Sequence, residues 1–294
     1  MDRIAEPGAA AAVAWSLAHG VLYVAGIYVA TALFRVDGVS VHDRDHPRII
    51  RRRMWGAGAA TLASLGISGV LLRRWQPAQD GGAAAAALTA LGLGVRAALP
   101  SAAVSLVLVC VLFLGPLVLD NLDGAFAWDR LKRVPQSLWG QPEHLRNYVV
   151  GPATEELVFR SAVVALWAAA GIATELCVLA SPMIFGVAHL HRAASRLIHD
   201  GTPLGAVVLS TAVQLAYTTV FGWVAAALFV RTRSVAGPIV AHAFCNFQGL
   251  PDPRRAADHP RYKYPVWLAF AAGLAGFLVL FEPMTRPGVF IPSL

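Results

Sequence analysis

Two adjacent carboxylates, followed four residues later by an arginine, interrupt a segment that is otherwise apolar enough to cross a membrane. The string is Thr154-Glu155-Glu156-Leu157-Val158-Phe159-Arg160. Charged side chains are costly in hydrocarbon, so their presence at membrane depth indicates a functional site. Glu156 and Arg160 share a helical face and can neutralise each other, whereas Glu155 points toward a different neighbour. This predicts one structural carboxylate and one free to act as a general base, unless the motif is only an ion pair that locks helices.

Two later apolar segments carry polar groups at the same helical spacing. Phe185 and His189 are four residues apart, and so are His242 and Asn246. Taken alone, His189 is typical of a packing or interfacial histidine, and the second pair of an interhelical hydrogen bond worth about 0.6 kcal/mol. Taken with the glutamates, the three polar faces must converge, because lipid tolerates none of them. A carboxylate and a histidine that activate water, with a histidine and an amide that hold an oxyanion, suit peptide hydrolysis without a covalent intermediate.

Two other chemistries remain open from the residues alone. Cys245 lies three residues after His242, close enough for a Cys/His pair, but a thiol nucleophile needs access and a thiolate, and the surroundings are apolar. Glu155, His189 and His242 offer the His₂Glu donor set of a catalytic zinc. The chain has no His-Glu-x-x-His helix, however. We therefore expect a site without a metal or another cofactor.

The composition indicates a polytopic membrane protein. Of the 294 residues, 57% are hydrophobic and 14% are charged, whereas about 25% are charged in soluble domains. We assign the net charge of +7 to juxtamembrane arginines near anionic lipid headgroups. Nucleic-acid binding is not expected, because the sequence has no patch of basic and aromatic residues and no Cys/His finger.

A spanning helix needs about 20 mostly apolar residues, and we count seven or eight such segments. The candidates run over about 9–34, 55–72, 101–119, 148–170, 173–191, 204–230, 235–250 and 265–281, with 83–99 as a short span or an interfacial helix that breaks at Pro100. A basic loop with five arginines separates the first two. Pro182 is expected to kink its span. The sequence predicts an all-α bundle of about eight transmembrane helices, one integral membrane domain over residues 1–294, with a catalytic cavity among the later helices.

Residues 120–146 form the most polar stretch of the chain. We predict a surface loop with a short amphipathic helix in this stretch. Trp128 and Trp139 suit a position at headgroup level.

The polar motifs resemble those of the CAAX protease and bacteriocin-processing family of intramembrane proteases, and most closely its branch of Ras-converting type II CAAX prenyl endopeptidases. The resemblance extends over about residues 15–284, with a protease core at roughly 145–250. The strings that carry it are Asp45-His46-Pro47, Leu145-Arg146-Asn147, Pro152-Ala153-Thr154-Glu155-Glu156-Leu157-Val158-Phe159-Arg160, Phe185-Gly186-Val187-Ala188-His189, Tyr217-Thr218-Thr219-Val220-Phe221-Gly222, Gly237-Pro238 and His242-Ala243-Phe244-Cys245-Asn246.

Members of this family remove the C-terminal a-a-X tripeptide from proteins whose CaaX cysteine is already prenylated. The resemblance implies an eight-helix core, a multi-pass location in the endoplasmic reticulum membrane and a cavity open to the cytosol and the bilayer. It implies farnesylated or geranylgeranylated CaaX proteins, such as small GTPases, as partners. It implies no bound metal.

Carried onto this sequence, the resemblance implies a role for each polar residue of the motifs. Water activation falls to Glu155 and His189, and stabilisation of the oxyanion falls to His242 and Asn246. The supporting residues are Glu156, Arg160 and Phe185.

Two other functions stay open beside proteolysis. A non-catalytic membrane scaffold or chaperone with the same fold would keep the polar cluster for helix packing alone. A transporter would use the carboxylates as a proton relay, although the sequence has no visible repeated half.

Overall fold

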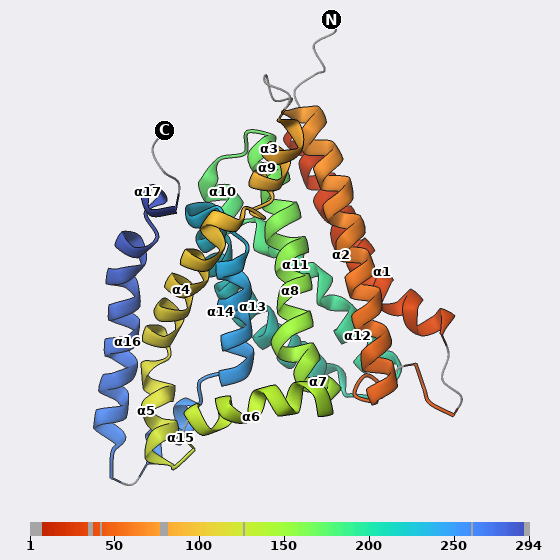
Figure 1. Cartoon of the computed structure of the whole chain (residues 1–294). Helices are drawn as coiled ribbons and strands as arrows, with labels where there is room; N and C mark the ends of the chain where they lie inside the picture. The colour runs from red at the N-terminus through yellow and green to blue at the C-terminus, as the bar shows by residue number, and fades with distance from the viewer. Residues whose placement is uncertain are drawn as a thin grey trace, which may run out of the picture.

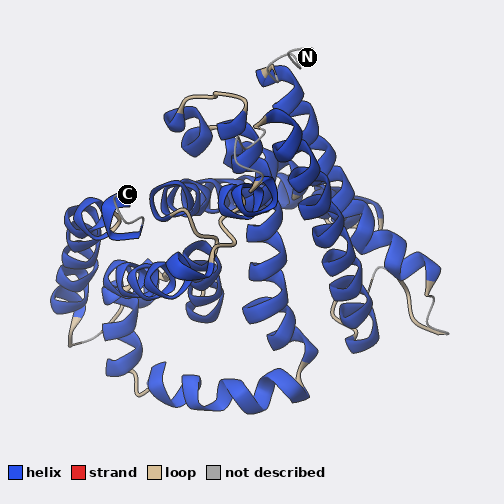
Figure 2. Ribbon diagram, turned by 45° about the horizontal axis from the view of Figure 1, so that its top comes forward, coloured by secondary structure: helices blue, strands red, loops and turns tan. Residues whose placement is uncertain are grey.

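The structure is a computed structural model that describes residues 8–34, 38–41, 43–76, 82–125, 127–259 and 261–290, without the side chains of residues 127, 128 and 139. The regular structure in these ranges is helical, with no strand (Figures 1 and 2). The predicted all-α fold is therefore confirmed. The expected headgroup position of Trp128 and Trp139 concerns side chains outside the described part.

Six helices in the described ranges are long and apolar enough to cross a membrane, which makes the chain a multi-pass membrane protein. They are Ala9–Leu33, Pro47–Trp75, Ala83–Leu112, Thr174–Ile198, Leu204–Thr232 and Lys263–Met284. The two other predicted spans are a composite helix over 142–169 and the short α14, Ala236–Gln248. Both carry polar motifs. The composite helix has too many charged residues, and α14 has too few residues, to meet the limits of an ordinary apolar span.

The helices pack as neighbours along one bundle (Figure 1). Helix α1 (Ala9–Leu33) packs along α2 (Pro47–Trp75), and α4 (Val95–Leu112) packs against both α14 and α16 (Lys263–Met284). Helix α13 (Leu204–Thr232) packs against α11 (Ser181–Ala188) and α14. The remaining helices are α3 (Ala83–Ala90), α5 (Leu114–Leu122), α6 (Ala127–Gly140), α10 (Thr174–Leu179), α12 (Leu190–Ile198), α15 (Pro253–Ala257) and α17 (Pro287–Phe290).

The helix boundaries at the Ala-rich segment and at the first basic loop differ from the prediction. The Ala-rich segment breaks at Gly92, not at Pro100, because Gly92 has a left-handed φ of 67° and Pro100 lies inside α4. Proline is tolerated there because neighbouring helices accommodate the lost hydrogen bond. Most of the predicted basic loop is the start of α2, since Pro47 occupies its first turn and the His46 ring accepts a hydrogen bond from the Arg48 N–H.

The expected kink before Pro182 is present. The segment divides at Ala180 into α10 and α11, and it continues as α12 to Ile198, beyond the predicted end of the span. The predicted end of the span at about residue 170 agrees with the structure, because α9 ends at Ala169 and Gly171 follows with a left-handed φ of 71°.

The predicted amphipathic helix in the polar stretch is α6, which lies across one end of the bundle (lower edge of Figure 1). Arg130 on α6 donates hydrogen bonds to Asp120 at 2.6 Å and to Gln248 at 3.0 Å. Arg255 on α15 donates to the same aspartate at 2.8 Å. These charge-assisted bonds tie α6 and α15 to the ends of α5 and α14.

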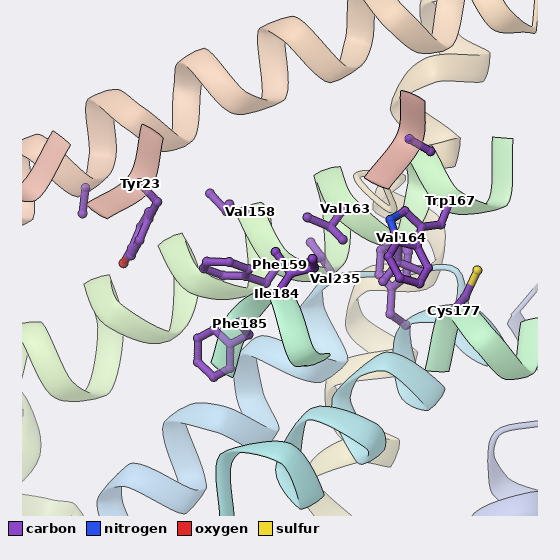
Figure 3. Packing of buried hydrophobic residues seen from close by; sticks show 13 residues of the cluster. Tyr23, Val158, Phe159, Val163, Val164, Trp167, Cys177, Ile184, Phe185 and Val235 are labelled. Atoms are coloured by element: carbon purple, nitrogen blue, oxygen red, sulfur yellow. The ribbon is translucent and has the colours of Figure 1, made fainter. Parts of the chain in front are cut away.

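Aromatic side chains fill the core beside the composite helix (Figure 3). The Phe159 ring lies between Tyr23 of α1 and Phe185 of α11, with edge-on contacts at centroid distances of 5.8 and 5.0 Å. This packing fixes the composite helix against α1 and α11.

Helices α11 and α13 approach closely at Gly222. A Cβ atom at Gly222 would lie 2.6 Å from the Pro182 Cβ atom and 3.3 Å from the Arg160 Nη2 atom. The proline ring is part of the chain and cannot rotate away, so only glycine fits here without a backbone shift.

We expect Gly222→Ala to lower the free energy of unfolding by about 1–3 kcal/mol, because the added methyl group overpacks this contact. The matched control is Gly58→Ala in α2, where a Cβ atom meets nothing within 4 Å; helix propensity should leave that variant unchanged or more stable by up to about 1 kcal/mol. Thermal unfolding in detergent measures both. Equal stability of the two variants would contradict the packing argument.

Candidate active site

The centre of the site is a fully buried carboxylate with two partners. Glu156 is 0% exposed, and its Oε1 atom accepts a hydrogen bond from the Arg160 Nη1 at 3.0 Å. The same oxygen lies 2.8 Å from the Nδ1 of His242 on α14. Because the carboxylate is ion-paired with Arg160, it accepts this bond and the His242 Nδ1–H donates it. The predicted pairing of Glu156 with Arg160 is confirmed.

Aromatic rings enclose the Arg160 guanidinium. Its Cζ atom lies 5.0 Å from the centroid of Phe185 and 5.7 Å from that of Phe221, within the range of cation–π attraction. Phe185 also packs edge-on against His189 at 4.4 Å, and Phe221 packs against His242 at 4.9 Å. The two phenylalanines therefore hold both the buried ion pair and the two histidines.

Glu155 points in a different direction from its neighbour, as helical geometry requires of adjacent residues. It lines a cavity of about 1130 Å³, which His189, His242 and Asn246 also line. The Glu155 Oε2 atom lies 3.9 Å from the His242 Nε2 atom. This separation is longer than a hydrogen bond and leaves room for one shared polar atom between the two groups.

The His189 ring is fixed by the carbonyl of the preceding turn. It sits at the junction of α11 and α12, 9% exposed, with its Nδ1 atom 2.8 Å from the Phe185 carbonyl oxygen. A carbonyl only accepts, so Nδ1 carries the hydrogen and Nε2 of the neutral ring keeps its lone pair. This is the tautomer that a general base requires.

Asn246 is exposed and lines the cavity one helical turn beyond His242. Its Nδ2 donates a hydrogen bond to the Asn147 carbonyl at 2.9 Å. An amide has two N–H hydrogens, so the second remains able to donate into the cavity. The structure thus brings the four predicted catalytic residues to one cavity, although their roles stay predictions.

Two π-helical turns flank the carboxylate pair. They are η1 (Arg146–Val150) and η2 (Leu157–Ala162), on either side of α8 (Gly151–Glu156), and α7 (Pro142–Leu145) and α9 (Val163–Ala169) complete the composite helix. The first widened turn directly precedes Pro152, which has no N–H for a regular α-helical bond. Such turns often occur at functional sites. They are hard to predict from the sequence, because each one adds a single residue to a turn in a segment that stays mostly apolar.

Sequence reasoning assigned no role to Tyr23 of α1. Its hydroxyl lies 2.9 Å from the Thr154 Oγ1, which itself donates to the Val150 carbonyl at 2.7 Å, so the tyrosine O–H donates to the threonine. This bond fixes the backbone immediately before Glu155. Tyr23 lies in an ordinary apolar span, and only its fixed distance from Thr154 in space identifies it.

Metal catalysis and thiol catalysis are the two other chemistries that the sequence leaves open. Among the described residues, no three His, Cys, Asp or Glu side chains are grouped so as to hold a metal ion. Cys245 lines the cavity and is a free thiol. Independence from metal and from the thiol stays a prediction that needs a chemical test.

Arg160→Met should destabilise the protein by about 3–5 kcal/mol, because it leaves the Glu156 charge buried without its cation. The double variant Glu156→Leu/Arg160→Met removes both charges and should recover most of that loss. Thermal unfolding of the two variants in detergent makes the comparison. A single variant as stable as the wild type would show that the ion pair does not control the packing.

Comparisons with known proteins agree with the motif-based resemblance. The family model described as type II CAAX prenyl endopeptidase Rce1-like matches residues 138–248. CAAX prenyl protease 2 of Homo sapiens is 36% identical over 84% of this chain and 75% of its own length. CAAX prenyl protease 2 of Arabidopsis thaliana is 30% identical over 94% and 90% of the two chains, and that of Caenorhabditis elegans is 30% identical over 85% and 90%. No solved structure gives a significant match. The chain belongs to the type II CAAX prenyl endopeptidase family.

Proposed function

We propose that this protein hydrolyses the peptide bond after the prenylated cysteine of CaaX proteins and releases the a-a-X tripeptide. The observation that carries the proposal is the cavity in which Glu155, His189, His242 and Asn246 meet. Family membership supports the same activity.

In the proposed reaction, Glu155 and His189 activate water. The water oxygen attacks the carbonyl carbon of the prenylcysteine, and its proton passes to this carboxylate and imidazole pair. The C–N bond then breaks, and the leaving amine takes up the proton. The neutral His189 tautomer, with a lone pair on Nε2, supports this role.

The oxyanion of the tetrahedral intermediate falls to His242 and Asn246. His242 donates from Nδ1 to Glu156, so a second donor at Nε2 requires the imidazolium form. The Glu156 carboxylate lies 2.8 Å from the Nδ1 atom of this ring, and the Glu155 carboxylate lies 3.9 Å from its Nε2 atom. Asn246 supplies the second N–H, and donors fixed in advance stabilise developing charge without reorganisation.

The cavity walls suit a lipid-modified substrate. Apolar side chains from four helices contribute to the cavity lining, among them Ile27, Met54, Val109, Leu112 and Val224. Extraction of a prenyl chain from the bilayer costs about 0.8 kcal/mol per CH₂, and a site between membrane helices avoids that cost. We propose farnesylated and geranylgeranylated CaaX proteins, small GTPases among them, as substrates, and the endoplasmic reticulum membrane as the location.

Glu155→Ala, His189→Ala and His242→Ala should each abolish tripeptide release from a farnesylated CaaX peptide, by about 10³-fold or more in kcat. Mass analysis of the products measures the release. Cys245→Ala is the matched control on the same helix as His242, and it should stay active. An inactive, folded Cys245→Ala variant would point to thiol catalysis, and full activity of any of the other three would refute the assignment.

Chelation provides an independent test of the mechanism. A tight zinc chelator should leave the rate of tripeptide release unchanged, because water activation is assigned to Glu155 and His189. The control is a zinc peptidase assayed with the same chelator. Loss of activity that added zinc restores would favour the His₂Glu metal site instead.

A further inference from the structure

A basic cluster lines the same cavity. It consists of Arg44 before α2, Arg53 on α2, Arg146 on η1 and Arg192 on α12, all of which line the cavity. Arg44, Arg146 and Arg192 all act electrostatically on Arg53, so the four charges lie near one another. Like charges held together in a partly buried site repel, and such a site favours an anionic ligand.

Most of these arginines already have a partner. Arg146 pairs with Asp45 at 3.1 Å and Arg44 pairs with the same carboxylate at 3.6 Å. Partial burial raises the pKa of Asp45, but the bonds to Arg146 and Arg44 outweigh it and hold that pKa below its ordinary value, so this carboxylate is charged. Arg53 donates to the Val41 carbonyl at 3.2 Å and lies over the Tyr28 ring.

Arg192 differs from the others. It is half-buried, and within the described ranges its guanidinium has no hydrogen-bond acceptor or carboxylate partner. Asp43 and Asp200 also line the cavity, but both are exposed to solvent, where their charges are screened. Arg196, one turn further along α12, is already bonded to Ser210.

The position of Arg192 relative to the reacting groups is fixed by the helix. Its N–H donates to the His189 carbonyl at 3.0 Å, so it follows His189 by one turn, about 4.5 Å along the axis. Residues three apart share a helical face, and Arg192 acts electrostatically on the His189 ring. An unpaired cation thus lies in the same cavity as the groups proposed to activate water.

The substrate of the proposed reaction carries a matching anion, its C-terminal carboxylate, three residues after the scissile bond. The released segment is three residues long, and an extended tripeptide spans about 10 Å. The released segment is therefore long enough for its free C-terminal carboxylate to lie beyond His189 when the scissile bond lies at Glu155. An arginine fork is the group best matched to a carboxylate.

We propose that Arg192 binds the C-terminal carboxylate of the substrate, with Arg53 beside it, and so sets the cut three residues from the chain end. This inference rests on the proposed function. It explains why the catalytic histidine and an unpaired arginine occupy one face at the junction of α11 and α12.

The test compares a farnesylated peptide with a free C-terminal carboxylate and the same peptide with a C-terminal amide. For the wild type, kcat/KM should be about 10- to 100-fold higher for the acid, the range for one hydrogen bond to a charged group. Arg192→Ala should remove that preference by lowering kcat/KM for the acid to the value for the amide, and thermal unfolding in detergent shows separately that the variant is folded. Arg192→Lys should restore part of the preference. The matched control is Arg254→Ala, an exposed arginine on α15 outside the cavity lining.

Two results would overturn the inference: a wild type that does not distinguish acid from amide, or an Arg192→Ala variant that slows both peptides equally. The assays are run in nanodiscs of phosphatidylcholine alone and with phosphatidylserine. An effect of Arg192→Ala only with phosphatidylserine would assign the arginine to a lipid headgroup and contradict the proposal.

Binding separates this inference from the proposed function. Fluorescent acid and amide peptides are bound to Glu155→Ala and to Glu155→Ala/Arg192→Ala. The single variant should prefer the acid, and the double variant should not. If the wild type cleaves neither peptide, the proposed function fails, and this binding comparison still decides the role of Arg192.

Discussion

The Glu156 carboxylate is completely buried among membrane helices, and the arrangement of the site follows from the need to neutralise it. An isolated charge in this position would cost several kcal/mol. Arg160 from the same helix and His242 from α14 supply the compensation through one oxygen, at 3.0 and 2.8 Å. Neutralisation therefore also fixes the orientation of His242, and it leaves Glu155, turned toward the cavity, as the carboxylate that can react.

Helices α11 and α13 pack around this buried ion pair. The Arg160 guanidinium lies between the Phe185 and Phe221 rings, which belong to α11 and α13, and Gly222 allows those helices to meet above it. The same phenylalanines pack on His189 and His242. The buried ion pair and the two histidines proposed to act in catalysis are thus in contact with the same two rings, so we expect a change in the packing of the arginine to displace both histidines.

The length of the apolar segments was enough to predict the all-α bundle, and the i, i+4 spacing predicted the pairing of Glu156 with Arg160. The cost of polar groups in lipid predicted which residues meet in the cavity. These patterns could not predict contacts between distant segments, such as the hydrogen bond from Tyr23 to Thr154 or the bond from Asn246 to Asn147. The break at Gly92 was misplaced to Pro100, because a left-handed glycine depends on its neighbours, including the Val235 N–H that bonds to the Gly92 carbonyl. The π turns around the carboxylates were missed because they leave the apolar pattern intact.

A structure of the protein with a farnesylated peptide whose scissile amide is replaced by a phosphonate would test the central claim most directly. The phosphonate copies the tetrahedral intermediate, with two oxygens in place of the attacking water and the oxyanion. One phosphonate oxygen should lie within hydrogen-bonding distance of Glu155 and His189, and the other within that distance of the His242 Nε2 and Asn246 Nδ2 atoms. A phosphonate bound to a metal ion, or held away from these four side chains, would contradict the central claim.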